Sequence, residues 1–223
     1  MENKEYINTL LKSKGLLAEL EESARERFMT VMLPDTARFI EQLVLLHKPK
    51  KILEIGTAIG YSGILMLEVF SGSHLYTIEY LEERAAEAKK NFEQANLADR
   101  VTQFIGDAKD IIGNISGEYD FIFIDGPKSW YDNFFDTLSN HLAAGGVIIC
   151  DNVLFRGYIS GQNEYEHRMQ TIVANMRNFL DKLTKDERFV TNIYDVGDGL
   201  AVSVLKTENL KLKNCGIKTM FSN

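Results

Sequence analysis

The sequence predicts an α/β domain with a seven-stranded, mostly parallel sheet that ends in an antiparallel hairpin. From residue 51 onward, short runs of β-branched residues alternate with helical patterns, which is typical of a parallel sheet covered by helices on both faces. The last two runs flank the segment DVGDG at residues 195–199, whose glycines and aspartates favour a tight turn between antiparallel strands. The chain before residue 51 carries helical patterns, which predicts a helical cover.

The strands are predicted from apolar runs bounded by turn residues. They are Lys51–Ile55, His74–Glu79, Val101–Ile105, Phe121–Ile124, Val147–Cys150, Phe189–Tyr194 and Leu200–Leu205. Between strands, Leu81–Ala95 has apolar or small residues at helical spacing with charges elsewhere, which indicates an amphipathic crossover helix. Before the sheet, we expect helices at Leu16–Thr30 and Thr36–His47, with Asp35 as the N-cap of the second.

The chain is predicted to form a single domain. No internal repeat, low-complexity stretch or linker divides residues 1–223. Within the domain, we expect a helical N-terminal cover at residues 1–48, a core at residues 49–206 and a basic C-terminal tail at residues 207–223.

Composition argues against several classes of protein. With 45% hydrophobic and 26% charged residues, the chain has the composition of a soluble globular protein. No apolar run approaches the roughly 20 residues of a membrane-spanning helix, and the N-terminus lacks the features of a signal peptide, so a cytoplasmic location is expected. The two cysteines, Cys150 and Cys215, fit neither a disulfide framework nor a zinc motif. The net charge of -7 argues against nucleic-acid binding through an overall positive surface, although it leaves room for a local basic patch.

The segment LEIGTAIGYSG at residues 53–63 is the strongest local motif. A strand runs through Gly56 and Gly60 into a helix, so the backbone is free to approach a ligand and the helix start offers free N–H groups. The spacing differs from the G-x-G-x-x-G of dinucleotide enzymes, and the segment lacks the Lys-Ser/Thr of a phosphate-binding P-loop. The motif therefore predicts a nucleotide-type site of another class.

Acidic residues follow the next two strands. Glu79 ends the second strand, where a carboxylate is able to accept hydrogen bonds from both hydroxyls of a ribose. Asp107 follows the third strand and is placed to accept a hydrogen bond from an adenine amino group. Taken alone, Asp107 is explained equally well as a helix N-cap. Three such features at successive strand ends favour a ligand at the carboxyl edge of the sheet.

Two further strands end in side chains with oxygen ligands. If these strands are neighbours, Asp125, Asp151 and Asn152 meet at one edge and offer two carboxylates and an amide oxygen, a set that suits Mg²⁺. The alternative is a polar turn after a strand. We favour the metal, because two adjacent buried carboxylates repel each other strongly without a cation.

The segments LEIGTAIGYSG, YTIEY, GDA, FIFIDGPKSWY and GGVIICDNVL together resemble the cation-dependent O-methyltransferases, which include catechol and caffeoyl-CoA O-methyltransferases. The resemblance runs in order through most of the chain. It implies a Rossmann-like class I S-adenosylmethionine-dependent methyltransferase fold. Within this family, the segments DGPKSWY and DNVLFRG are most similar to the bacterial tRNA 5-hydroxyuridine methyltransferases.

The resemblance also implies roles for individual residues. The residues expected to bind S-adenosylmethionine are Met32, Glu54, Gly56, Gly60, Ser62, Glu79, Asp107, Ala108 and Asp125. Asp125, Asp151 and Asn152 match the family's metal ligands, and the catalytic residues would be Lys128 and Asp125. Met32 is explained nearly as well as an ordinary core methionine.

The implied reaction transfers a methyl group to a hydroxyl that lies beside a second oxygen atom. 5-Hydroxyuridine at the wobble position of tRNA satisfies this requirement through its O5 hydroxyl and O4 carbonyl, and the product would be 5-methoxyuridine. Trp130 or Tyr131 would then stack on the extruded base, while Lys128, Arg156 and Arg168 would meet phosphates of the anticodon region. Without the resemblance, core packing explains the two aromatic residues and a solvated surface explains the two arginines.

Two alternatives to a tRNA substrate stay open. A small catechol satisfies the same chemistry, whereas a non-catalytic S-adenosylmethionine-binding module would need only the cofactor site. The presence of all the matched metal ligands and of Lys128 counts against the module. We also expect a homodimer without a membrane partner, because the helices between Leu16 and His47 offer apolar faces that related enzymes use in dimers.

Overall fold

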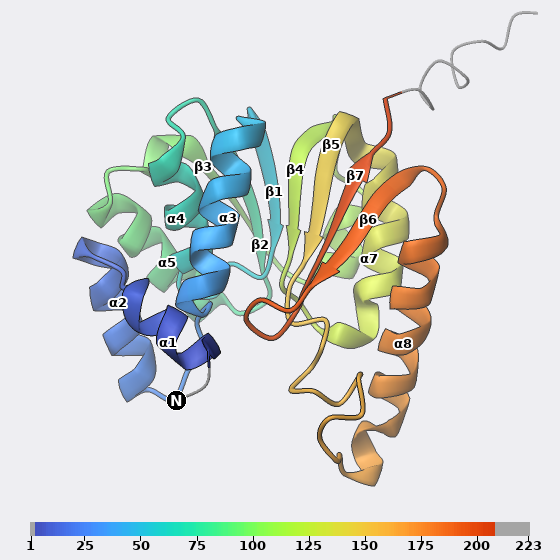
Figure 1. Cartoon of the computed structure of the whole chain (residues 1–223). Helices are drawn as coiled ribbons and strands as arrows, with labels where there is room; N and C mark the ends of the chain where they lie inside the picture. The colour runs from blue at the N-terminus through green and yellow to red at the C-terminus, as the bar shows by residue number, and fades with distance from the viewer. Residues whose placement is uncertain (1–2, 208–223) are drawn as a thin grey trace, which may run out of the picture.

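A computed structural model describes residues 3–207 as a sheet with helices packed on both faces (Figure 1). Beyond Thr207, the tail predicted at residues 207–223 lies outside the described residues, as does Cys215. The α-helices are α1 (Asn3–Leu10), α2 (Gly15–Glu26), α3 (Pro34–His47), α4 (Tyr61–Val69), α5 (Glu82–Gln94), α6 (Ala108–Ile112), α7 (Tyr131–Leu138) and α8 (Gln170–Lys185). Short 3₁₀ helices are η1 (Ala98–Arg100), η2 (Lys128–Trp130), η3 (Ser139–His141) and η4 (His167–Met169). The strands are β1 (Lys51–Ile55), β2 (His74–Glu79), β3 (Val101–Ile105), β4 (Tyr119–Ile124), β5 (Leu142–Cys150), β6 (Phe189–Tyr194) and β7 (Leu200–Leu205).

The strands form one sheet in the order β3-β2-β1-β4-β5-β7-β6. The first five strands of the chain pair in parallel, whereas β7 runs antiparallel to both β5 and β6. The predicted fold class, with its terminal antiparallel hairpin, is therefore confirmed. The chain leaves β1 toward β2 and returns to place β4 on the other side of β1. Such a reversal of strand order opens a crevice at the carboxyl ends of the strands.

Most strand boundaries agree with the sequence prediction, but β4 and β5 begin earlier than expected. β4 begins at Tyr119 rather than Phe121, and β5 begins at Leu142 rather than Val147. Tyr119 pairs with Leu142, and the register then shifts before Phe121 pairs with Val147. This irregularity lets β5 continue through Gly145 and Gly146, which suggest a turn when the sequence is read alone.

The N-terminal helices differ from the prediction at three of their ends, and the start of α2 differs by one residue, Gly15 instead of Leu16. α2 ends at Glu26 rather than Thr30, because Phe28 has a φ of 54°, which an α-helix does not include. α3 begins at Pro34, so Asp35 is not the predicted N-cap and lies in the first helical turn. Proline is favoured at the first helical position because it has no backbone N–H to leave unpaired there.

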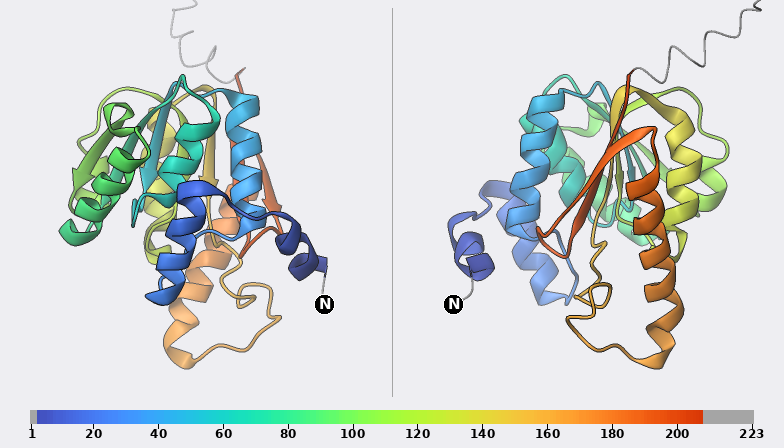
Figure 2. Two further views of the ribbon diagram at one scale, coloured as in Figure 1. Left: turned by 90° about the vertical axis from the view of Figure 1, so that its left-hand side faces the viewer. Right: turned by 45° about the vertical axis from the view of Figure 1, so that its right-hand side comes forward.

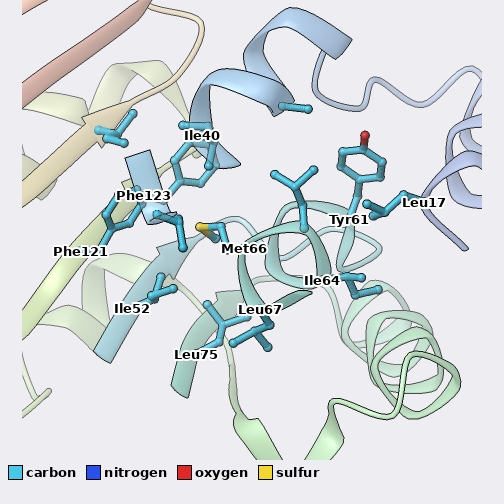
Figure 3. Packing of buried hydrophobic residues seen from close by; sticks show 14 of the residues in the cluster. Leu17, Ile40, Ile52, Tyr61, Ile64, Met66, Leu67, Leu75, Phe121 and Phe123 are labelled. Carbon is cyan, nitrogen blue, oxygen red and sulfur yellow. The ribbon is translucent and has the colours of Figure 1, made fainter. Parts of the chain in front are cut away.

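The sheet carries one apolar core on each face. Ile52 of β1 packs in the cluster under α3 and α4, whereas its neighbour Leu53 packs in the cluster under α7 and α8. Figure 3 shows the first cluster, where Ile40 of α3 and Met66 of α4 lie over Ile52. Side chains on both faces hold the parallel strands firmly, and this fixes the positions of the strand ends.

The carboxyl edge of the sheet lies at the end of the molecule that also holds the N-terminal helices and a long segment from the second half of the chain. Figure 2 shows α1, α2 and the long segment between β5 and α8 at the same end of the molecule. Within residues 3–207, no helix combines the length and the apolar character needed to cross a membrane.

Candidate active site at the carboxyl edge of the sheet

Two cavities open beside each other at the carboxyl edge. The first has a volume of about 450 Å³ and is lined by the segment before α3, the β1–α4 segment and the loop after β5. The second has a volume of about 500 Å³ and lies beside the ends of β2, β3 and β4. Gly56, Glu79, Arg84 and Asp125 line both cavities. The cavities are therefore two parts of one cleft that join at these four residues.

Gly56 is required for the close approach of β1 and β4. Its φ is 101°, and a Cβ atom at this position would lie 2.2 Å from the backbone oxygen of Asp125. The backbone N–H of Gly56 donates to the carbonyl of Ile78 over 3.0 Å, which ties the loop to β2 as well. A glycine at this point lets three strand ends converge on the cleft.

Gly60 has a different role from the one predicted. It precedes α4 with a φ of 87°, and a Cβ atom there would approach the Phe92 ring to 3.2 Å. Gly60 does not line either cavity, and its small size lets the start of α4 pack against Phe92 of α5. Ser62, in the first turn of α4, does line the first cavity.

Glu54 also lies outside both cavities, beneath the loop rather than in the cleft. Its side chain is completely buried and accepts hydrogen bonds from Ser62 Oγ at 2.5 Å and Thr77 Oγ1 at 2.6 Å. Burial raises the pKa of Glu54 to about 7, and the two hydrogen bonds oppose this rise. Because Ser62 faces the first cavity, Glu54 reaches the site only through that hydroxyl.

Glu79 places a carboxylate at the junction of the cavities. One oxygen accepts a hydrogen bond from the backbone N–H of Ala58 at 2.8 Å, and the other accepts from Leu81 N–H at 3.0 Å. These two bonds fix the side chain, and each carboxylate oxygen retains a lone pair for a ligand.

Asp107 is the N-cap of α6, which was the alternative explanation for this residue. Its side chain accepts a hydrogen bond from the backbone N–H of Lys109 at 3.0 Å and forms an ion pair with the Lys109 ammonium group at 2.9 Å. These contacts lower the pKa of Asp107. Asp107, Ala108 and Trp130 also line the second cavity, and Lys109 Nζ lies 4.5 Å from the centre of the Trp130 ring.

Asp125, Asp151 and Asn152 come together because β4 and β5 are neighbours. The Asp125 side chain is exposed to the cleft. The protein that surrounds it on its other sides keeps water away and raises its pKa, and the nearby charge of Lys128 opposes this rise. Burial, and then the charge of Asp125, raise the pKa of Asp151 to about 7. In the part of the chain that the structure describes, no group of three or more His, Cys, Asp and Glu side chains is arranged for a metal. Asp125 and Asp151 contribute two carboxyl groups to this part of the first cavity, and Asn152 adds an amide oxygen.

Lys128 lies beside this oxygen-rich set. Its Nζ is 3.5 Å from Asn152 Oδ1, 5.5 Å from the centre of the Tyr131 ring and 5.9 Å from the centre of the Phe155 ring. The ammonium group is therefore held between two aromatic faces and the acidic end of the cleft.

The structure corrects the predicted stacking role of Tyr131. Its side chain is fully buried, and its hydroxyl donates to the backbone oxygen of Asp151 at 2.9 Å. Tyr131 therefore supports the Asp151 backbone and is unable to stack on a base. Trp130 lines the second cavity rather than the first, and Arg168 lines neither and pairs with Glu166.

Met32 and Arg156 line the first cavity, as the resemblance implies for them. The sequence alone gives no sign of Arg84 or Phe155, because neither belongs to a motif. Both line the first cavity only because α5 and the loop after β5 pack beside it. The sequence analysis also missed Asp198, although the DVGDG turn was singled out, because a turn motif does not reveal which loop it contacts.

Comparison with known proteins places this geometry in context. A family profile described as O-methyltransferase matches residues 8–206. The chain is 30% identical to the catechol O-methyltransferase of Niastella koreensis, over 90% of this chain and 95% of that protein. It is 28% identical to an O-methyltransferase from Bacillus cereus solved in complex with SAH, with a TM-score of 0.78 over 91% of this chain and 96% of the other. The SAH-bound methyltransferase PaMTH1 from Podospora anserina is 25% identical, with a TM-score of 0.80 over 92% and 97% of the two chains.

Proposed function

The chain belongs to the O-methyltransferase family and uses S-adenosylmethionine as its methyl donor; we propose that it methylates a hydroxyl group adjacent to a second oxygen atom. We also propose that the reaction depends on Mg²⁺ held by Asp125, Asp151 and Asn152. The observation that carries the proposal is the convergence of two carboxyl groups and an amide oxygen beside Lys128 in the first cavity, with Asp125 at the junction to the second.

The cofactor proposal assigns the adenosine end of S-adenosylmethionine to the second cavity. The fixed carboxylate of Glu79 would accept hydrogen bonds from the ribose hydroxyls. Ala108 and Trp130 line the same cavity and would contact the adenine, so we now assign Trp130 to the cofactor rather than to the substrate. Ser62 and Met32 line the first cavity and would contact the methionine end.

The metal proposal follows from the chemistry of the ligand set. Two carboxyl groups whose pKa values are both raised form a pair that a divalent cation stabilises, because it neutralises their mutual repulsion. Mg²⁺ prefers oxygen ligands and keeps several of its positions for water or substrate. Bound there, it would lower the pKa of a substrate hydroxyl and fix the direction of that oxygen.

The chain's own residues would then complete the reaction. We propose that Lys128, whose Nζ lies beside Asn152 Oδ1, acts as the general base in its free-amine form and takes the hydroxyl proton at Nζ. Methyl transfer is an in-line displacement, so the acceptor oxygen must face the methyl group from the side opposite the sulfur. Asp125 lines both cavities and marks the point where the two reactants meet. Holding two reactants in such an orientation lowers the activation free energy by on the order of 7 kcal/mol.

We propose 5-hydroxyuridine at the wobble position of tRNA as the first substrate candidate. Its O5 hydroxyl and O4 carbonyl are neighbouring oxygens, as the metal site requires. Arg84 and Arg156 line the first cavity and are exposed, and within residues 3–207 their guanidinium groups have no hydrogen-bond or ion-pair partner. Free cations at the mouth of a cleft in a chain of net charge -7 support a substrate that carries phosphates.

A small catechol is the second candidate. Its two adjacent hydroxyls satisfy the same requirement, and the similarity to a protein named catechol O-methyltransferase extends over nearly the whole chain. This candidate does not use the unpaired arginines.

One experiment separates the candidates. The enzyme is incubated with S-adenosylmethionine, Mg²⁺ and either tRNA that carries 5-hydroxyuridine or free catechol, and the products are identified by mass spectrometry. The first candidate predicts 5-methoxyuridine with the native enzyme and none with Asp151→Ala. Methylated catechol together with unchanged tRNA would establish the second candidate. Absence of product from both would contradict the proposal of an acceptor with adjacent oxygens.

The homodimer expected from the sequence stays a proposal. Leu45 and Leu46 of α3 are 49% and 82% exposed, and Val190 of the edge strand β6 is 62% exposed, which gives a second copy an apolar surface to cover. Analytical ultracentrifugation should give twice the monomer mass, and a Leu46→Glu variant should sediment as a monomer.

A further inference from the structure

The loop that follows β5 has an unusual concentration of left-handed backbone. Asn152, Phe155 and Arg156 have φ values of 54°, 47° and 58°. A left-handed conformation costs roughly 1 kcal/mol or more for a residue with a side chain, although asparagine tolerates it better than most. Three such residues within one short loop persist only if the surroundings hold them in place.

The loop is held against the turn between β6 and β7. Val153 N–H donates to the carbonyl of Gly199 at 3.0 Å, and Leu154 N–H donates to the carbonyl of Asp198 at 2.9 Å. Arg156 N–H donates to the side-chain oxygen Oδ1 of Asp198 at 2.6 Å. Of these three bonds, only the last depends on a side chain, and it holds a residue in the left-handed region.

The turn keeps its shape through other contacts. Gly197 N–H donates to Asp35 Oδ2 at 3.1 Å, and Gly199 N–H donates to the carbonyl of Val196 at 2.9 Å. A Cβ atom on Gly199 would lie 2.3 Å from a side-chain carbon of Leu154, so the turn and the loop are packed directly against each other. Loss of the Asp198 side chain would therefore release the loop at Arg156, while the two backbone bonds from Val153 and Leu154 and the turn itself stay in place.

The loop in turn shapes the substrate side of the cleft. Phe155 and Arg156 both line the first cavity, and Asn152 supplies the amide oxygen of the proposed metal site. The Phe155 ring is one of the two rings near Lys128 Nζ, and it packs edge-on against Tyr158 with ring centres 5.3 Å apart. Displacement of Arg156 would move Phe155 and thus the surroundings of the Lys128 ammonium group.

We propose that Asp198 is a positioning residue for methyl transfer: it accepts the Arg156 N–H and so holds Phe155 and Arg156 against the acceptor substrate. The proposal rests on the proposed function for its effect on turnover, but the hold on the loop is a property of the chain alone. Asp198 also lines the first cavity, where its charge acts on Asp151. The positioning role is separate from that charge and lies in the hydrogen bond that Asp198 accepts from the Arg156 N–H.

Two variants distinguish the hydrogen bond from the charge. Asp198→Asn keeps an oxygen that is able to accept the Arg156 N–H but removes the negative charge, whereas Asp198→Ala removes both. Asp195→Ala is the matched control, because Asp195 belongs to the same turn, is exposed and pairs with Lys4 rather than with the loop. Thermal unfolding of all three shows whether each remains folded.

The experiment combines hydrogen exchange with steady-state kinetics. In Asp198→Ala, amide exchange over residues 155–158 should rise about tenfold, and kcat/KM for the acceptor should fall about tenfold, with the Kd of S-adenosylmethionine unchanged. Asp195→Ala should match the native enzyme in all three measurements, and Asp198→Asn should match it in amide exchange and in the Kd of S-adenosylmethionine. If Asp198→Asn behaves like Asp198→Ala in amide exchange, or if exchange in Asp198→Ala is unchanged, the proposal is wrong. If the native enzyme methylates neither acceptor, the proposed function fails, whereas the exchange result still decides the hold on the loop.

Discussion

At the scale of single residues, the buried carboxyl group of Glu54 makes the stability of the fold depend on pH. Its carboxyl group is fully buried, and burial raises its pKa from 4.5 to about 7. In the unfolded chain the group ionises near its ordinary pKa, so the folded state binds the proton more tightly between these two values. The ionised form therefore destabilises the fold, and its cost is absent below the unfolded pKa and complete above the folded one.

Replacement of this carboxyl group should remove that pH dependence. Between pH 4.5 and 7, native Glu54 should lower the free energy of unfolding progressively by about 3 kcal/mol relative to Glu54→Gln. Denaturant titrations of both proteins across this range measure the difference directly. A difference that stays constant with pH would show that Glu54 does not titrate with a raised pKa.

Glu79 should instead control cofactor affinity. Glu79→Ala removes the acceptors proposed for two ribose hydroxyls, so the Kd of S-adenosylmethionine should rise roughly 10- to 100-fold. Isothermal titration calorimetry measures this change. Glu82→Ala, an exposed acid at the start of α5, is the control and should bind like the native protein. Equal affinity in Glu79→Ala would remove Glu79 from the cofactor site.

At the scale of elements, the cleft depends on how closely β1 and β4 approach. A Cβ atom at Gly56 would meet the Asp125 backbone at 2.2 Å, whereas one at Gly161 would meet nothing within 4 Å, although Gly161 also has a positive φ of 79°. Gly161→Ala should therefore cost only about 1 kcal/mol of stability, from backbone conformation. Gly56→Ala should cost more than this, because β4 must shift. Chemical denaturation compares them, and equal losses would contradict the close-approach explanation.

The same elements show what could be predicted from the sequence. Runs rich in β-branched, aromatic and other apolar residues between turn residues located β1, β2 and β3 correctly, and neighbouring strand ends brought Asp125 and Asp151 together as expected. The roles of adjacent aromatic residues were not predictable in this way. α7 begins at Tyr131, and that start turns its ring into the core while Trp130 stays at the cleft.

At the scale of the whole molecule, the difficulty for a tRNA substrate is the net charge of -7. Binding would rest on local cations, and the structure leaves Arg84 and Arg156 unpaired at the first cavity within the described residues. The sequence could not identify Arg84, because the helical pattern of α5 gives no sign that this side chain reaches a cleft formed by distant segments.

Charge at the cleft should therefore set the salt dependence of tRNA binding. For the tRNA candidate, an Arg84→Ala, Arg156→Ala double variant should bind tRNA more weakly and lose about one unit of salt slope per arginine. Arg168→Ala should change the slope less, because Arg168 lies outside both cavities and is already paired with Glu166. Filter binding over a range of salt concentrations tests this. A slope unaffected by the double variant would argue for the catechol candidate.

Crystals soaked in Mn²⁺ show whether a divalent cation binds where β4 and β5 end. We expect an anomalous scattering peak about 2.1 Å from oxygens of Asp125, Asp151 and Asn152, absent from Asp151→Ala crystals soaked in the same way. A native crystal without this peak, with the three side chains turned apart, would mean that no cation binds at these strand ends.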